Sequence, residues 1–122
     1  MCSFCNILAL RGNFNRRTVN SIITEISNLI ENGVKEVNLI SQDISSYGKD
    51  FNDNTGLATL LKSISEIERD FWFCLFYRYP NSFTDETMEV IADDNRFCRY
   101  LDMPSQLVNN EVLKTMNRKI DR

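Results

Sequence analysis

The chain has 122 residues, of which 43% are hydrophobic and 25% charged, an ordinary balance for one globular domain. The net charge is only −3, and basic residues cluster only in RGNFNRR (11–17), so composition does not indicate a nucleic-acid-binding surface. No apolar run approaches the roughly 20 residues of a membrane-spanning helix, and the first residues lack the pattern of a secretion signal. We therefore expect a cytoplasmic protein without a membrane partner.

The first motif along the chain is a pair of cysteines, Cys2 and Cys5, spaced C-x-x-C. Two thiolates at this spacing can converge on one metal ion or cluster, but a zinc site would need two more ligands, and the chain has no second C-x-x-C and no histidine. A thioredoxin-like redox pair would stand at the head of a helix, whereas polar, loop-like residues follow Cys5 here. Spacing alone leaves open a metal role or a pair of terminal thiols that oxidise.

A helix, a strand and a long loop follow the cysteines. Apolar residues recur at helical spacing between Thr18, a suitable N-cap, and Gly33, a suitable C-terminal stop. The stretch VKEVNLIS (34–41) is rich in branched residues and predicts a strand. The polar stretch that follows, 42–55, is long enough to be a functional loop.

The second half repeats the alternation of helix and strand. Periodic apolar residues predict a helix over 57–67, and the continuous apolar run FWFCLFY (71–77) predicts a strand buried on both faces of a parallel sheet. A helix is expected over 84–93, a strand over 97–103, and a last helix from about Asn110.

This order of elements predicts an α/β fold with a parallel sheet of β/α units. The first helix has no strand before it, so we expect that the chain begins after a missing first strand. Three strands cannot close a barrel, so both edges of the sheet should be open. Ligands in such folds bind at the carboxyl ends of strands, where this chain carries SQD (41–43), YRYP (77–80) and DMPSQ (102–106).

The remaining cysteines, Cys74 and Cys98, lie in apolar segments, and nothing in the sequence points to secretion. We therefore expect both to be free thiols that pack in the core as small hydrophobic side chains. The aromatic residues Trp72, Tyr77 and Tyr79 are likewise expected to serve packing.

Five stretches together resemble the radical S-adenosylmethionine methylthiotransferases, most closely the branch that modifies an aspartate of a small-subunit ribosomal protein. The family places C-x-x-x-C-x-x-C in the first loop of a partial β/α barrel, with an aromatic residue before the third cysteine. Cys2, Phe4 and Cys5 match the last three of these positions, so the first cysteine would lie before Met1. The other matching stretches are RGNFNRR, GVKEVNLISQDISSYGKD, FYRYPNSFTDE and RYLDMPSQLVNNEVLKTMNR.

The resemblance implies a fold and a set of cofactors. The fold would be a partial parallel, TIM-like barrel fragment of three to four β/α units with the first strand missing. Residues 1–122 would be one piece of the radical S-adenosylmethionine domain, without the amino-terminal and carboxy-terminal domains of the family. Cys2 and Cys5 would be metal ligands of a four-iron, four-sulfur (4Fe-4S) cluster that cleaves S-adenosylmethionine to a radical.

The resemblance also implies the remaining site residues and the partners. The cofactor-binding residues would be Phe4, Gln42, Asp43, Asp102 and Gln106. The substrate would be a small-subunit ribosomal protein and the electron donor a flavodoxin or ferredoxin, while no direct nucleic-acid binding is expected of this segment. The sequence names no catalytic residue.

Two positions depart from the family pattern. Cys74 stands where the family usually has an arginine, and Leu107 stands where it has a histidine, so activity is open even for the parent protein. The alternatives are a transfer-RNA methylthiotransferase and a non-catalytic remnant whose open sheet edges pair with a partner. Asp43 favours the protein-modifying branch, because the RNA-modifying relatives usually have an asparagine there.

Overall fold

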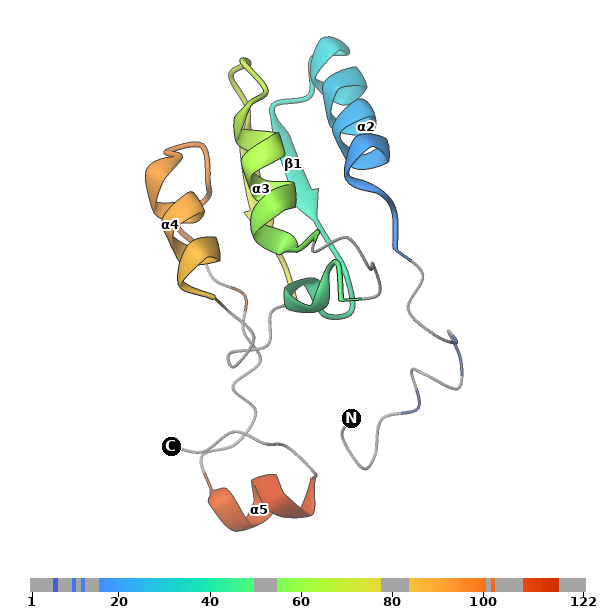
Figure 1. Ribbon diagram of the computed structural model, residues 1–122, viewed down its shortest axis with the longest axis vertical. Helices are drawn as coiled ribbons and strands as arrows, with labels where there is room; N and C mark the ends of the chain where they lie inside the picture. The colour runs from blue at the N-terminus through green and yellow to red at the C-terminus, as the bar shows by residue number, and fades with distance from the viewer. Residues whose placement is uncertain are drawn as a thin grey trace. The chain divides into compact units, whose positions relative to one another are not determined.

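The computed structural model describes residues 6, 10, 12, 16–49, 55–77, 84–100, 102 and 109–116 (Figure 1). The chain divides into two compact units, one of residues 16–103 and one of residues 1–15 with 104–122. The larger unit contains α2 (Val19–Glu31), β1 (Glu36–Leu39), the short 3-10 helix η1 (Ile44–Ser46), α3 (Leu57–Ser65), β2 (Trp72–Leu75) and α4 (Asp85–Asp93), and the smaller unit contains α5 (Asn110–Thr115). In the described part of the chain, no helix has the length and apolar character needed to cross a membrane.

Helix α2 begins and ends where its sequence signals predict. The Thr18 side chain caps the helix by accepting a hydrogen bond from the Ser21 N–H. At the other end Gly33 adopts a φ of +89°, and its N–H donates to the Ile30 carbonyl at 2.9 Å. The predicted helices starting at Thr84 and near Asn110 are confirmed as α4 and α5, and the one over 57–67 as α3.

The predicted parallel pairing is confirmed, but the sheet is smaller than expected. Strands β1 and β2 pair in parallel, with Val37 opposite Phe73. Of the strand expected over 97–103, the described residues 97–100 and 102 show only a single parallel bridge between Phe73 and Phe97. Beyond that bridge Tyr77 adopts a φ of +57°, which ends the extended run of β2 and prevents a longer ladder there. The described fold is therefore α/β with a small parallel sheet.

Helices α2, α3 and α4 all contribute to a core on one face of this sheet. In Figure 1 they stand side by side, with the strands behind α3. Alternate residues of the β2 run, Phe71, Phe73 and Leu75, are at most 1% exposed and pack in one cluster with Leu61 and Ile64 of α3. This face holds the hydrophobic core.

The opposite face of the sheet is not covered in the same way. Trp72 is 56% and Ile40 67% exposed, whereas Cys74, on the same face of β2 as Trp72, is 7% exposed. The predicted burial of β2 on both faces is therefore confirmed at Cys74 and wrong at Trp72. Tyr77 is 53% exposed, and the expectation that Trp72 and Tyr77 serve core packing was wrong. Tyr79 lies outside the described residues.

Cys74 and Cys98 lie next to each other and form a disulfide, with Cα atoms 5.2 Å apart. The bridge between Phe73 and Phe97 brings them together, because it places the next residue of each segment side by side on one face. The rings of Phe76 and Tyr100, two residues further on, are also in contact, at 6.2 Å between centroids. The prediction that both thiols are free was wrong, since the residue pattern does not show the register that pairs them, but the predicted burial of Cys74 is confirmed at 7% exposure.

Candidate functional site

The carboxyl ends of the three predicted strands meet at Tyr77. The Tyr77 N–H donates to Oδ2 of Asp102 at 3.1 Å, and the Tyr77 carbonyl accepts a hydrogen bond from the Ile44 N–H at 3.2 Å. Ile44 follows β1, Tyr77 follows β2, and Asp102 follows the segment bridged to β2. The three loops that the sequence places at one edge of the sheet are therefore linked by hydrogen bonds.

Asp43 organises the loop after β1. Its carboxylate accepts hydrogen bonds from the Ser45 N–H at 3.2 Å, from the Ser45 hydroxyl, and from the Ser46 hydroxyl at 2.5 Å. These bonds cap η1, as short acidic side chains commonly do at the start of a helical turn. Asp43 thereby fixes the backbone of Ile44, which is 4% exposed and donates to Tyr77.

The same loop returns closely against the start of α3 at Gly48. Gly48 has a φ of +85°, and a Cβ atom there would stand 1.6 Å from the Thr55 carbonyl oxygen. Only glycine satisfies both the left-handed backbone and this close approach. Gly48 thus keeps the loop compact beneath the strand ends.

Of the other five predicted site residues, the structure describes one, and four lie outside its described residues. Gln42 is exposed in the loop after β1, directly before Asp43. Cys2, Phe4, Cys5 and Gln106 lie outside the described residues. Within residues 16–49, 55–77, 84–100 and 109–116, no three Cys, Asp or Glu side chains cluster closely enough to hold a metal ion.

Sequence reasoning missed the role of Tyr77 at this edge. It is the one non-glycine residue with a positive φ in the described part of the chain. Such a conformation is rare for a bulky residue, and residues held this way concentrate at functional sites. The sequence carries no local signal for it, because the hydrogen bonds that hold it come from residues 25 positions ahead and 33 positions behind.

The amino-terminal edge of the sheet holds a different group of polar residues, centred on Arg96. The guanidinium donates to the carbonyls of Ser65 at 2.7 Å, Ile67 at 2.5 Å and Arg69 at 3.1 Å, and its carbon lies 5.1 Å from the centroid of the Phe71 ring. It also pairs with Asp94, Nη2 to Oδ2 at 2.7 Å and Nε to Oδ1 at 3.0 Å. Arg96 thus fastens the carboxyl end of α3 and the chain that leads into β2.

The pairing changes the acidity of both partners. Hydrogen bonds from Arg96 lower the pKa of the Asp94 carboxyl below its ordinary value, although partial burial opposes the shift. The hydrogen bond to Asp94 raises the pKa of Arg96, again against partial burial. Both groups are therefore charged at neutral pH, and the pair is a structural element of the amino-terminal edge.

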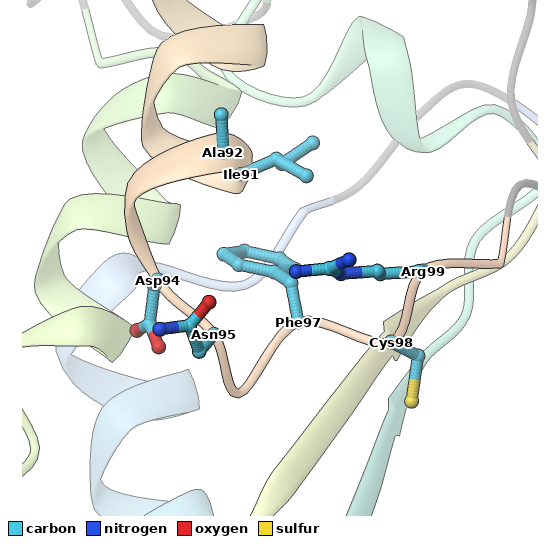
Figure 2. Close-up of a pocket in the computed structure, with 7 residues that line it drawn as sticks. All are labelled: Ile91, Ala92, Asp94, Asn95, Phe97, Cys98 and Arg99. Atoms are coloured by element: carbon cyan, nitrogen blue, oxygen red, sulfur yellow. The ribbon is translucent and has the colours of Figure 1, made fainter.

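A cavity of about 310 Å³ lies between the end of α4 and residues 97–99 (Figure 2). Its lining comprises Ile91, Ala92, Asp94, Asn95, Phe97, Cys98 and Arg99. In Figure 2 the sulfur of Cys98 points away from this space, and the Asp94 carboxylate lies on the far side of Asn95 from Arg99. Because Asp94 is engaged by Arg96, the cavity offers less chemistry than the carboxyl edge, which remains the better candidate site.

Comparison with known proteins gives one consistent result. No protein-family model matches the chain. The ribosomal protein uS12 methylthiotransferase RimO of Geotalea uraniireducens is 42% identical over 118 residues, which are 97% of this chain and 26% of that protein. The proteins of the same name from Clostridium novyi and Protochlamydia amoebophila are 42% identical over 119 residues (98% of the chain, 27% of that protein) and 44% identical over 119 residues (96% and 25%).

The chain thus spans about a quarter of the length of the curated relatives it matches. Within that quarter the match extends over nearly all of its residues. The resemblance to the RimO-type methylthiotransferases that the sequence motifs indicated is confirmed.

Proposed function

We propose that this chain is a segment of a radical S-adenosylmethionine methylthiotransferase that adds a methylthio group to an aspartate of ribosomal protein uS12. The observation that carries the proposal is the identity of 42% to 44%, over at least 96% of the chain, to proteins named for uS12 methylthiotransfer. The activity belongs to the parent protein, and we expect the isolated segment to be inactive.

In this proposal the segment forms part of a parallel β/α barrel. Barrels of this class place helices outside and the other face of the strands inside. The arrangement in residues 16–103 supports this, because the helices pack on one face of parallel strands and Trp72 and Ile40 are exposed on the other. The first strand and the flanking amino-terminal and carboxy-terminal domains would lie outside this sequence.

The cofactors are assigned to the carboxyl edge and the loop that precedes α2. Cys2 and Cys5 would supply two of the three thiolates of a 4Fe-4S cluster, and the third would come from a cysteine before Met1. When bound, the cluster would supply the electron that cleaves S-adenosylmethionine. The donor set fits this cluster, since thiolates are its ordinary ligands.

The chain's own residues would bind and orient the S-adenosylmethionine. Phe4, Gln42 and Gln106 are proposed as contacts, and the exposure of Gln42 beside the linked strand ends supports its part of that assignment. Asp43 and Asp102 are proposed to line the same edge. Their hydrogen bonds to Ser45, Ser46 and Tyr77 fix the shape of the edge that the cofactor would meet.

The partners and the compartment follow from the same assignment. The parent protein would act on uS12 with electrons from a flavodoxin or ferredoxin, in the cytoplasm. Neither a membrane nor a nucleic acid has a place in this proposal.

The test uses the intact protein that contains this segment, purified without oxygen and reconstituted with iron and sulfide. With S-adenosylmethionine and a chemical reductant, the wild type should add the mass of a methylthio group to an aspartate of uS12, located by peptide mass spectrometry. Cys5→Ala should lose both this product and iron. The matched control is the double variant Cys74→Ser with Cys98→Ser, which removes the two disulfide-bonded cysteines elsewhere in the chain and should keep its iron.

Three outcomes would contradict the proposal. A methylthio group on transfer RNA and not on uS12 would favour the RNA-modifying branch. A parent protein that binds iron but yields no product on either substrate would exclude the transferase activity. Absence of stoichiometric iron in the wild type would favour a non-catalytic remnant.

A further inference from the structure

The side chain of Tyr77 is exposed at a position where the alternation of β2 predicts burial. Phe71, Phe73 and Leu75 occupy alternate positions and are all buried on the helix-covered face. If the strand continued, Tyr77 would be the next residue on that face, because side chains alternate with a period of two. It is instead 53% exposed.

The backbone conformation of Tyr77 also departs from that of a strand. Its φ of +57° lies in the left-handed region, which costs free energy for any residue with a Cβ atom. A bulky residue stays there only when its surroundings hold it. Both peptide groups of Tyr77 are held in this way, the N–H by Asp102 and the carbonyl by the Ile44 N–H.

The two hydrogen bonds that hold Tyr77 differ in how rigidly the partner group is held. Ile44 is 4% exposed and lies in η1, which Asp43 caps, so its N–H is a rigid donor. Asp102 is a side-chain acceptor that follows a short bridged segment, and its carboxylate reaches the Tyr77 N–H at 3.1 Å. Removing the Asp102 carboxylate would release the N–H of Tyr77 without disturbing η1.

We propose that Asp102 is a positioning residue, which locks Tyr77 in the left-handed conformation and so presents the Tyr77 ring at the carboxyl edge as a ligand contact. The Asp102 carboxylate accepts a hydrogen bond from the Tyr77 backbone, and Asp43 caps η1, whose Ile44 N–H donates to the Tyr77 carbonyl. The same edge therefore carries an exposed aromatic ring and two carboxylates, a combination that favours a cationic ligand. The identity of that ligand rests on the proposed function, under which it is the sulfonium of S-adenosylmethionine. Asp43 acts likewise through the backbone, by fixing Ile44.

The conformational part is tested by nuclear magnetic resonance on the 122-residue chain. A positive φ brings the amide proton of Tyr77 close to its own Hα and gives a strong cross-peak between them. Asp102→Ala should weaken this cross-peak to the level of extended residues and speed the exchange of the Tyr77 amide, whereas Asp102→Asn, which keeps an oxygen acceptor, should restore both. Asp93→Ala removes an exposed carboxylate elsewhere and should change neither.

A second measurement, which does not use Asp102→Ala, keeps the inference testable if that variant does not fold. If the Tyr77 N–H donates to a carboxylate, its proton shift should move when acid protonates that carboxylate, and the shift should not move in Asp102→Asn. An Asp102→Ala chain that keeps the wild-type cross-peak, or a Tyr77 amide that ignores acid, would overturn the inference.

The ligand part is tested in the intact parent protein by the affinity for S-adenosylmethionine. Asp102→Ala and Tyr77→Ala should each weaken binding by about tenfold, the size expected for the loss of one cation–π contact. The double variant should be no weaker than either, because the two residues act as one unit. If the losses of the two single variants add in the double variant, the positioning role of Asp102 is wrong. If the wild type shows the left-handed Tyr77 but binds no S-adenosylmethionine, the proposed function is contradicted, while the conformational role of Asp102 is not.

Discussion

The two edges of the same small sheet are held together by different means. At the amino-terminal edge one guanidinium, that of Arg96, donates to three backbone carbonyls, pairs with Asp94 and lies over the Phe71 ring. At the carboxyl edge the backbone of Tyr77 is held by Asp102 and Ile44, and the side chains of Tyr77 and Gln42 are exposed.

This difference suits the two edges to different tasks: the amino-terminal edge stabilises the fold, and the carboxyl edge is the one proposed to bind a ligand. Each guanidinium nitrogen of Arg96 donates to carbonyls or a carboxylate of the chain itself, and the side chain is only 23% exposed. This edge therefore offers few free donors to a ligand. The carboxyl edge instead uses backbone groups and short acidic side chains for its internal bonds and leaves larger side chains accessible. This is the division expected of β/α folds, in which ligands bind at the carboxyl ends of strands.

The strongest test of this contrast is Arg96→Ala. The change removes the guanidinium that donates to three carbonyls and to the Asp94 carboxylate, which keeps only the backbone N–H of residue 96 as a donor from that residue. We therefore expect a loss of about 3 kcal/mol in the free energy of unfolding. Urea unfolding followed by far-ultraviolet circular dichroism measures it. The control is Lys62→Ala, which breaks the exposed Lys62–Glu86 pair and should cost less than about 1 kcal/mol. Equal losses in the two variants would contradict a stabilising role for the amino-terminal edge.

A second test concerns the disulfide that joins β2 to the bridged segment. Its two cysteines are 24 residues apart, a loop whose closure stabilises the folded state by about 2 to 3 kcal/mol. Thermal unfolding should therefore shift to lower temperature in the presence of a reductant. The double variant Cys74→Ser with Cys98→Ser should unfold at one temperature with or without reductant. If reductant does not change the unfolding temperature of the wild type, the disulfide does not stabilise the folded chain.

A third test addresses the loop at the carboxyl edge by a matched pair of glycines. Gly48 and Gly33 have similar φ values, +85° and +89°, but a Cβ atom would clash with Thr55 at Gly48 and meet nothing at Gly33. Gly33→Ala should cost about 1 kcal/mol for backbone strain alone, and Gly48→Ala about 2 kcal/mol or more. Chemical denaturation compares the two. If the two variants lose similar free energies of unfolding, the loop at Gly48 can shift to make room for the added Cβ atom.

The smallest expected effect is the pH dependence that Asp94 adds to the amino-terminal edge. Its pKa is lower in the folded chain than the ordinary value of 3.8, so the unfolded state takes up the proton more readily. The stabilisation is complete above that ordinary value and is lost as pH falls through the lower pKa of the folded state. The difference in unfolding free energy between wild type and Asp94→Asn should shrink over this acid range, and a constant difference would contradict the linkage.

The helices and the class of fold could be predicted because their signals are local. Thr18 and Thr84 accept hydrogen bonds from residues three positions ahead, and Gly33 ends α2 within one turn. The parallel pairing of β1 and β2 followed from the alternation of elements, which limits the possible connections.

The features that could not be predicted depend on register and on distant partners. The disulfide requires the bridge between Phe73 and Phe97, and Arg96 gains its role only when α3 ends beside it. Of the site, the placement of Asp43 and Asp102 at one edge followed from strand order. The turn of Tyr77 out of the core did not, because two loops far apart in the sequence impose it.

Trp72 has a practical consequence for experiments on this chain. It is the sole tryptophan of the sequence and stands, 56% exposed, on the sheet face away from the helices. Its fluorescence emission therefore reports directly whether solvent or another surface lies against that face. A shift of the emission to shorter wavelength on mixing with another protein or a ligand would show that this face has been covered.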